Sequence, residues 1–246
     1  MLLEIDLRID FAFKFLFARS GRERLLLHLL NAILARRLAR PLTFIEVLNP
    51  FDDKNFADDK LSILDIKARD DAGRWYNIEM QLGPDGHYTA RIVYYLSGLF
   101  HGQLGEGDGY EMLKPTIGIH IVDRILFPDV PDHHLSFLLR EERHGFPLNE
   151  MMRIELIELP KFLRGEEQLD DDLSRWCYLF RHATKLDTAN LPSKLATPTM
   201  VEATRTLEML QQSPQERMLY EARLKKQRDE ASALQWARRE GEQAGL

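Results

Sequence analysis

Hydrophobic residues recur at helical spacing at both ends of the chain and alternate with polar residues in between. Near the amino end, residues 9–38 carry apolar side chains in a helical rhythm that breaks near Ser20 and Gly21, so two helices are predicted. FIEVLNPF, residues 44–51, predicts a short strand that stops at its Asn-Pro pair. The acidic segment 52–60 that follows is predicted to be a loop.

The middle of the chain carries one further helical pattern and several strand patterns. Residues 86–104 predict a helix with an apolar face formed by Ile92, Tyr95, Leu96 and Leu99. Alternating isoleucines in TIGIHIVDRILF, residues 116–127, predict a strand. LSFLLREE at 135–142 and MMRIELIEL at 151–159 predict two more strands, at a separation that suits a hairpin.

The carboxyl-terminal part returns to a helical pattern from about Leu169. Residues 213–246 are rich in Glu, Lys, Arg, Gln and Ala and predict one long exposed helix. The order of elements is helices, three strands, a helix, more strands and a helical tail. This order predicts an α/β or α+β fold with one mixed sheet.

The segment KLSILDIKARDDAGRWYNIEMQL, residues 60–82, predicts a hairpin. Asp71, Ala72 and Gly73 suit a three-residue loop whose last residue takes a left-handed backbone, which glycine adopts without strain. That loop sets the register and places Asp65 directly opposite Glu79, where facing side chains start roughly 5 Å apart.

The same register gives the hairpin an apolar and a polar face. The apolar face is formed by Leu64, Ile66, Ala68, Tyr76, Ile78 and Met80. The polar face is formed by Asp65, Lys67, Asn77, Glu79 and Gln81. Two carboxylates this close repel each other, so either one is protonated or a cation lies between them. A divalent ion that prefers hard oxygen ligands, Mg²⁺ or Mn²⁺, satisfies both carboxylates at once.

A plainer interpretation is that this is the solvated face of a hairpin on which Lys67 neutralises a neighbouring carboxylate. Two features favour an enclosed cluster instead. Leu61 and Ile63 lie on the same side as the acids, and the predicted helix at 86–104 is placed to cover that side.

Composition and charge narrow the class of protein. The 246 residues are 44% hydrophobic, as in an ordinary globular chain. No charged leader or membrane-length apolar run is present, so we expect a cytoplasmic protein with no membrane partner. The single cysteine, Cys177, excludes an internal disulfide and is expected to be buried. The net charge of −6 argues against indiscriminate binding of nucleic acid but is compatible with a local basic groove.

The chain resembles the PD-(D/E)XK nuclease superfamily, and most closely its recombination-promoting nuclease and transposase branch. The resemblance is carried by an Asp, a hairpin, a Glu-x-Gln motif, and then an arginine and tyrosines on a helix. Its blocks are IDFAFKFLF with Asp10, Phe13 and Lys14, the hairpin with Lys60, Asp65, Glu79 and Gln81, and RIVYYLSGLF with Arg91, Tyr94 and Tyr95. It covers roughly residues 6 to 130 and continues more loosely into the charged tail.

The resemblance implies an α/β fold: a restriction-endonuclease-like core with a mixed central sheet flanked by helices, plus a helical C-terminal tail. Residues 1–168 would form the nuclease-like domain and 169–246 the helical C-terminal region. The implied activity is hydrolysis of DNA phosphodiester bonds with Mg²⁺ or Mn²⁺, and Asp65 and Glu79 would hold the metal.

The chain departs from the superfamily motif at two positions. Gln81 stands where the superfamily carries a lysine, although the branch commonly has glutamine there, and Leu64 replaces the proline that precedes the aspartate. A neutral amide can hydrogen-bond but cannot offset phosphate charge. From the geometry of the hairpin we suggest that Lys67 supplies the missing charge.

These considerations give a set of candidate site residues. The catalytic candidates are Asp65, Glu79, Gln81 and Lys67, and the DNA-binding candidates are Arg91, Tyr95, Lys60 and Lys14. Because Arg91 and Tyr95 are four residues apart, they share one face of the predicted helix. In the plainer alternative, Tyr95 packs in the core and Arg91 pairs with Glu79. Asp10 and Glu23 are candidates for the acid that the superfamily carries on its first helix.

Three functions compete at this point. The first is a DNA endonuclease of recombination or mobile-element type, favoured by the opposed carboxylates. The second is a catalytically inactive relative that binds nucleic acid or protein, favoured by Gln81 and the net negative charge. The third is a structural module of a larger assembly, supported by the charged tail. A homo-oligomer is a separate expectation for the partners of the chain.

Overall fold

The structure is a computed structural model that describes residues 1–51, 65–83, 86–243 and 245. The helices are α1 (Asp10–Phe17), α2 (Glu23–Leu34), α4 (Tyr88–His101), α5 (Asp172–His182), α6 (Pro198–Gln212) and α7 (Pro214–Gln243). The strands are β1 (Ile45–Val47), β2 (Asp65–Asp70), β3 (Trp75–Gln81), β4 (Thr116–Val122), β5 (His134–Leu138) and β6 (Met152–Glu158). Short 3₁₀ turns lie at Tyr110–Met112, Leu159–Lys161, Glu166–Gln168 and Ala183–Lys185.

The strands form one six-stranded sheet in the order β1-β2-β3-β4-β6-β5. β1, β2 and β3 are antiparallel neighbours, β3, β4 and β6 run parallel, and β5 pairs antiparallel with β6. The predicted α/β fold with a mixed central sheet flanked by helices is therefore confirmed. The two helices expected on either side of Ser20 and Gly21 are also present, and Gly21 has the positive φ of 86° that this turn requires.

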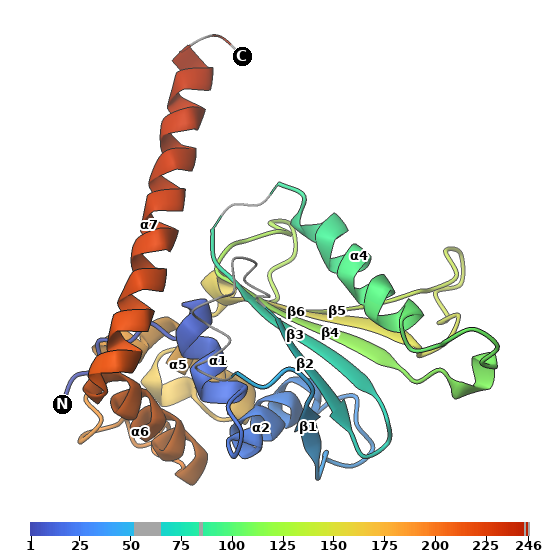
Figure 1. The fold of residues 1–246 in the computed structure, drawn as a ribbon, viewed down its shortest axis with the longest axis horizontal. Coiled ribbons are helices and arrows are strands. Elements are labelled where there is room, and N and C mark those ends of the chain that lie inside the picture. The colour runs from blue at the N-terminus through green and yellow to red at the C-terminus, as the bar shows by residue number, and fades with distance from the viewer. Residues whose placement is uncertain (52–64, 84–85, 244, 246) are drawn as a thin grey trace.

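Helices cover both faces of the sheet. In Figure 1, α1, α2 and α5 lie on one side of the sheet and α4 crosses the other. The larger core lies under α1, α2, α5 and α6, where the phenylalanines of α1 contact Trp176 and Phe180 of α5. The helical region predicted from residue 169 onwards begins with α5, which belongs to this core. Cys177 of α5 is buried there, as expected. Burial raises the pKa of the Cys177 thiol to about 12, which disfavours the reactive thiolate form.

The prediction for the apolar face of α4 is only partly right. The buried stripe of α4 is Tyr88, Ile92 and Leu96, which pack towards β4 and β6. Tyr95 is 55% exposed and does not pack in the core. The reason is that α4 sits over the middle of the sheet, so its Tyr95 side overhangs the polar face of the β2–β3 hairpin and leaves a groove.

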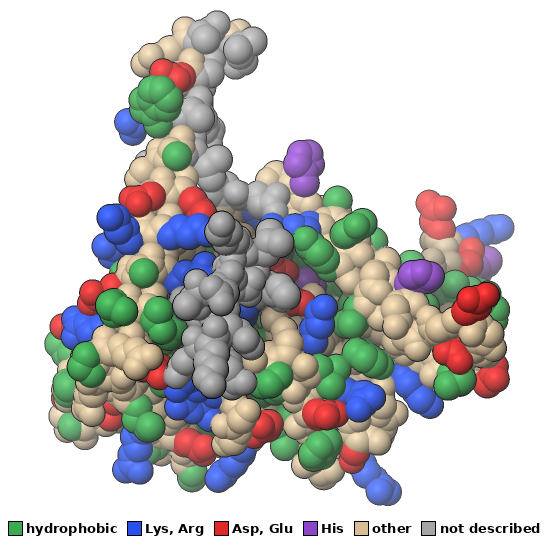
Figure 2. Space-filling model, in the orientation of Figure 1, with side chains coloured by type: hydrophobic (Ala, Val, Ile, Leu, Met, Phe, Trp, Pro, Cys, Tyr) green, Lys and Arg blue, Asp and Glu red, His purple; other side chains and the backbone are tan. Residues whose placement is uncertain are grey.

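The final helix, α7, stands out from the rest of the molecule, as predicted for an exposed charged segment (Figures 1 and 2). Its first turns are fixed to the amino end of the chain. The Tyr220 hydroxyl accepts a hydrogen bond from the backbone N–H of Asp6 at 2.8 Å, and Arg19 pairs with Glu216 at 2.6 Å. A division of the chain after residue 168 stays a prediction. Of the helices that the structure describes, none has the length and apolar character needed to cross a membrane.

The packing of His28 predicts how stability depends on pH. His28 Nδ1 accepts a hydrogen bond from the indole N–H of buried Trp176 at 3.0 Å. Burial lowers the pKa of His28; Arg175 and Arg24 lower it further, whereas Asp172 opposes them. The unfolded chain therefore binds more protons than the folded chain just below the ordinary histidine pKa, and stability falls as the pH is lowered through about 6.5.

Replacing His28 with glutamine, which keeps an acceptor for Trp176, should flatten this dependence. The melting temperature of the variant should fall less than that of the wild type between pH 7.5 and 5.5, as measured by differential scanning calorimetry. His144→Gln changes a histidine that is mostly exposed and serves as the control. Parallel slopes for wild type and His28→Gln would contradict the assignment.

Candidate active site

The β2–β3 hairpin brings Asp65 and Glu79 together. The register pairs Asp65 with Glu79 and Lys67 with Asn77, as the loop chemistry predicts. Gly73 has φ +78°, and the backbone N–H of Asp70 donates to the Arg74 carbonyl across the predicted three-residue loop. Ile66, Ala68, Tyr76, Ile78 and Met80 are buried on the opposite face of the sheet, which confirms the predicted alternation for the described residues. Lys60, Leu61, Ile63, Leu64 and the predicted loop 52–60 lie outside the described residues.

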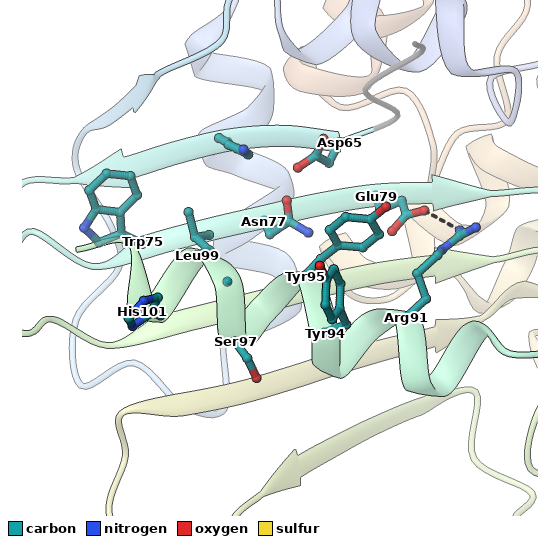
Figure 3. A pocket seen from close by; sticks show the side chains of 13 residues that line it. Asp65, Trp75, Asn77, Glu79, Arg91, Tyr94, Tyr95, Ser97, Leu99 and His101 are labelled. Carbon is teal, nitrogen blue, oxygen red and sulfur yellow. Dashed lines mark hydrogen bonds and ion pairs between the residues drawn. The ribbon is translucent and has the colours of Figure 1, made fainter. Parts of the chain in front are cut away.

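A groove of about 860 Å³ runs between this polar face and α4. Its floor is formed by Asp65, Lys67, Trp75, Asn77 and Glu79, and its wall by Arg91, Tyr94, Tyr95, Ser97, Gly98, Leu99, His101 and Gly102. Figure 3 shows Tyr95 extending from α4 towards the sheet near Glu79, with Trp75 and His101 at the other end of the groove. Two tyrosines on the wall, Tyr94 and Tyr95, are 75% and 55% exposed and meet edge to face.

Asp65 is a partly buried carboxylate with little compensation. Among the described residues, no side chain donates a hydrogen bond to its carboxylate or pairs with it. Burial raises the pKa of Asp65, and the negative charge of Glu79 raises it further. Lys67, and Lys14 from α1, lower the pKa. The structure thus brings Lys14 and Lys67, both predicted site residues, into the electrostatic environment of Asp65.

Glu79 is almost fully buried and is held by Arg91. Arg91 Nη2 donates to Glu79 Oε1 at 2.9 Å, so the ion pair named in the plainer alternative is present (Figure 3), and a DNA contact by Arg91 stays a prediction. The second oxygen, Glu79 Oε2, lies 3.6 Å from His120 Nδ1. Both carboxylate oxygens therefore face nitrogen atoms of other elements, one from α4 and one from β4.

The Gln81 amide is engaged at both ends. Its Oε1 accepts a second hydrogen bond from Arg91 Nη2 at 2.8 Å, and its Nε2 donates to the Leu82 carbonyl at 2.9 Å. In this structure the Gln81 side chain therefore binds the Arg91 guanidinium. The guanidinium of Arg91 lies beside Glu79.

The remaining first-helix candidates lie outside the groove lining. The Asp10 carboxylate is 3.9 Å from Arg223 of α7, and Glu23 Oε1 accepts from the Gly21 N–H at the start of α2.

Sequence reasoning missed His120 and Tyr88 as site residues. His120 is 1% exposed in β4 directly beside Glu79, and its Nδ1 is 3.2 Å from the Tyr88 hydroxyl. The available signal was a single histidine inside the otherwise apolar strand TIGIHIV. A buried polar side chain in a central strand is uncommon and marks a position with a specific partner.

The donor atoms on the groove floor are oxygens that suit Mg²⁺ or Mn²⁺. No group of three or more His, Cys, Asp or Glu side chains among the described residues is arranged to hold a metal ion. The set of donors is instead two carboxylates and an amide. Asn77 Oδ1 is buried on the same face as Asp65 and Glu79, and no described residue donates a hydrogen bond to it. Two carboxylates and a free amide oxygen are hard ligands, so the residues present fit such an ion.

Comparison with known protein families assigns residues 7–237 to the family described as PD-(D/E)XK nuclease family transposase. The chain belongs to this family. No curated protein and no solved structure matches it. For a PD-(D/E)XK family member, the mixed sheet flanked by helices is the expected restriction-endonuclease-like fold, and membership indicates a nuclease- or transposase-associated role.

Proposed function

We propose that the protein is a metal-dependent DNA endonuclease of recombination or transposition type. The observation that carries the proposal is the pair of carboxylates, Asp65 and Glu79, opposed on the floor of an open groove. Family membership supports DNA as the substrate. The proposed reaction is hydrolysis of a phosphodiester bond, in which water attacks phosphorus and the P–O bond to the leaving oxygen breaks.

Asp65 and Glu79 would hold Mg²⁺ or Mn²⁺, with the Asn77 amide oxygen as a further donor. The burial of the Asp65 carboxylate, which Lys67 and Lys14 offset only in part, favours this role, because a cation offsets the cost of desolvating the charge. When bound, the ion would lower the pKa of a coordinated water and neutralise charge that develops on the phosphate.

The chain's own cations provide the remaining charge in the groove. Arg91 is fixed by Glu79 and Gln81, so its guanidinium is positioned before the substrate arrives. Lys67 and Lys14 lie close enough to Asp65 to lower its pKa, and we propose that they stabilise the phosphate backbone near it. Gln81 takes part by holding Arg91, and Lys60 stays a predicted DNA contact.

Tyr95 is proposed to contact DNA from the groove wall. Its ring is exposed beside the carboxylates, and an aromatic ring placed in this way can stack on a base or pack on a sugar. Tyr95→Ala should weaken DNA binding by about tenfold, measured by fluorescence anisotropy without added metal so that cleavage does not interfere. Tyr110→Ala removes an 84% exposed tyrosine outside the groove and should leave the Kd unchanged. Equal effects of the two substitutions would count against the groove as the DNA-binding surface.

The proposal is tested by incubating the purified protein with supercoiled plasmid in Mg²⁺, in Mn²⁺ and in EDTA. We expect nicked and linear products with either metal and none with EDTA. Intact plasmid under all conditions, with the protein folded, would reject an endonuclease function.

A second candidate function is a nuclease-fold module that binds DNA or protein without cutting. The observation that favours it is the full engagement of Arg91 and Gln81 with each other and with Glu79, which occupies one oxygen of a proposed metal ligand. Isothermal titration calorimetry distinguishes the two candidates. A clear Mn²⁺ isotherm that disappears in Asp65→Asn supports the enzyme, and DNA binding without any metal isotherm supports the module.

Cellular context and assembly stay predictions of the same proposal. A DNA endonuclease with one buried thiol suits the cytoplasm, where DNA and reducing conditions coexist. The projecting α7 is the element that we propose for self-association, because its distal part carries the exposed aromatic side chain of Trp236. Light scattering on a chain that lacks residues beyond 225 tests this directly.

A further inference from the structure

We propose that His120 and Tyr88 are positioning residues that fix the Glu79 carboxylate for the proposed metal site. This inference rests on the proposed function and assigns a role to two buried residues that the family motif does not include. Neither residue lines the groove, so both would act on the substrate only through Glu79.

The sheet places His120 beside Glu79. β4 runs parallel to β3, and the register pairs Glu79 with His120 and Asn77 with Gly118. The imidazole is 1% exposed, and its Nδ1 faces two oxygen atoms: Glu79 Oε2 at 3.6 Å and the Tyr88 hydroxyl at 3.2 Å. The Tyr88 and His120 rings meet edge to face, with centroids 5.9 Å apart.

These contacts oppose the ion pair on the other oxygen of Glu79. Arg91 holds Oε1 from α4, and its guanidinium carbon lies 4.9 Å from the centre of the Tyr88 ring. One turn of α4 thus reaches Glu79 twice, directly through Arg91 and indirectly through Tyr88 and His120. A carboxylate that is hydrogen-bonded through one oxygen and packed closely against a buried ring at the other loses little freedom when it takes up a ligand, which is how supporting residues raise metal affinity and activity.

Gly118 provides the space for the imidazole. A Cβ atom at position 118 would lie 2.8 Å from His120 Nε2, closer than such atoms approach in real structures. Any side chain at this position would therefore push the ring away from its present place. The present position of the His120 ring therefore requires glycine at position 118.

The stability of the fold does not explain His120. Its Nε2 is buried with no hydrogen-bond partner among the described residues, and its neighbours on the same face of the sheet, Val122 and Leu156, are apolar. The tautomer with the proton on Nδ1 fits best, because it directs an N–H towards the Tyr88 hydroxyl, within hydrogen-bond distance, and towards the more distant Glu79 Oε2, and it leaves only a bare acceptor unpaired. An apolar residue at this position would avoid the cost of desolvating the imidazole. The role of the histidine is therefore to position the Glu79 carboxylate.

The test compares substitutions that move or remove the facing nitrogen. His120→Asn puts an amide nitrogen near the place of Nδ1, His120→Gln puts it near Nε2, and His120→Leu removes it. We expect kcat for plasmid cleavage to fall about tenfold in the Leu and Gln variants with KM unchanged, and to stay within about threefold of wild type in the Asn variant. The melting temperature of His120→Leu should equal or exceed that of wild type.

Gly118→Ala should reproduce the loss of kcat although His120 is still present. Gly165→Ala is the matched control, since a Cβ at position 165 meets no atom within 4 Å. Wild-type kcat in His120→Leu, or equal losses in the Asn and Gln variants, would overturn the inference and leave the proposed function intact.

Metal affinity separates failure of this inference from failure of the proposed function. If the wild-type protein cleaves no DNA, the proposed function fails, and Mn²⁺ titration by calorimetry decides the positioning role alone. Weaker Mn²⁺ binding by His120→Leu than by wild type would then support the inference, and equal binding would overturn it.

Discussion

Replacing Asp65 with asparagine should reduce the rate of DNA cleavage by about three orders of magnitude. The substitution keeps the size of the side chain but removes one of the two opposed carboxylates, and losses of several kcal/mol are typical when charge stabilisation at a metal site is removed. The rate should be measured on plasmid under single-turnover conditions at saturating Mg²⁺. The isotherm for Mn²⁺ should disappear in parallel.

The same substitution should not destabilise the protein, and this separates a functional from a structural role for Asp65. Burial raises the pKa of Asp65 above that of an exposed aspartate. The folded chain therefore binds more protons than the unfolded chain just above pH 4, and the ionised side chain lowers stability as the pH rises through that interval. At pH 7 we expect the melting temperature of Asp65→Asn to equal or exceed that of wild type without added metal.

Asp71→Asn is the matched control for this prediction. Asp71 belongs to the same hairpin, but it lies exposed in the turn, where its carboxylate accepts a hydrogen bond from the Thr43 hydroxyl at 3.2 Å. Its replacement should change cleavage by less than about twofold. If Asp65→Asn cleaves DNA at the wild-type rate, the carboxylate pair is not the reactive centre.

The hairpin could be predicted in detail because its determinants are local. The Asp-Ala-Gly loop needs a positive φ only at Gly73, and the strand period of two then fixes which side chains face each other. Asp65 and Glu79 were therefore placed opposite each other from residue spacing alone. The mixed sheet followed from the order of elements in the same way.

The surroundings of Glu79 depend on contacts between distant segments and were not predictable in the same way. The register of β4 beside β3 is set after a crossover through α4, so no local pattern places His120 next to Glu79. The position of α4 on the sheet likewise determines which residues of the helix are buried, and it leaves the Tyr95 side chain in the groove. The ambiguity over Arg91 had the same origin: both a DNA contact and a pair with Glu79 suited its position on the helix face.

Arg91, rather than Lys67, is expected to supply the charge that a lysine at position 81 provides in the superfamily. Arg91→Met should therefore lower the cleavage rate about a hundredfold, whereas Lys67→Met should lower it only a fewfold. The reason is geometric: Arg91 is hydrogen-bonded to both Glu79 and Gln81, and the described residues show no ion pair for Lys67. Arg24→Met, which removes a helix arginine paired with Glu202, is the control and should retain full activity.

A more specific experiment moves the positive charge from Arg91 on α4 to position 81 on β3. Gln81→Lys alone places a second cation beside Arg91 and removes the amide that anchors it, so the rate should fall. In the double variant Gln81→Lys/Arg91→Met the lysine lies next to Glu79 without a competing cation, and the rate should recover to within about tenfold of wild type. Such recovery corresponds to a coupling of about 1–3 kcal/mol in a double-mutant cycle, as is found for residues in direct contact. Additive losses in the double variant would show that Arg91 and Gln81 do not act as one unit, and a loss in Lys67→Met equal to that in Arg91→Met would assign the charge to Lys67 instead.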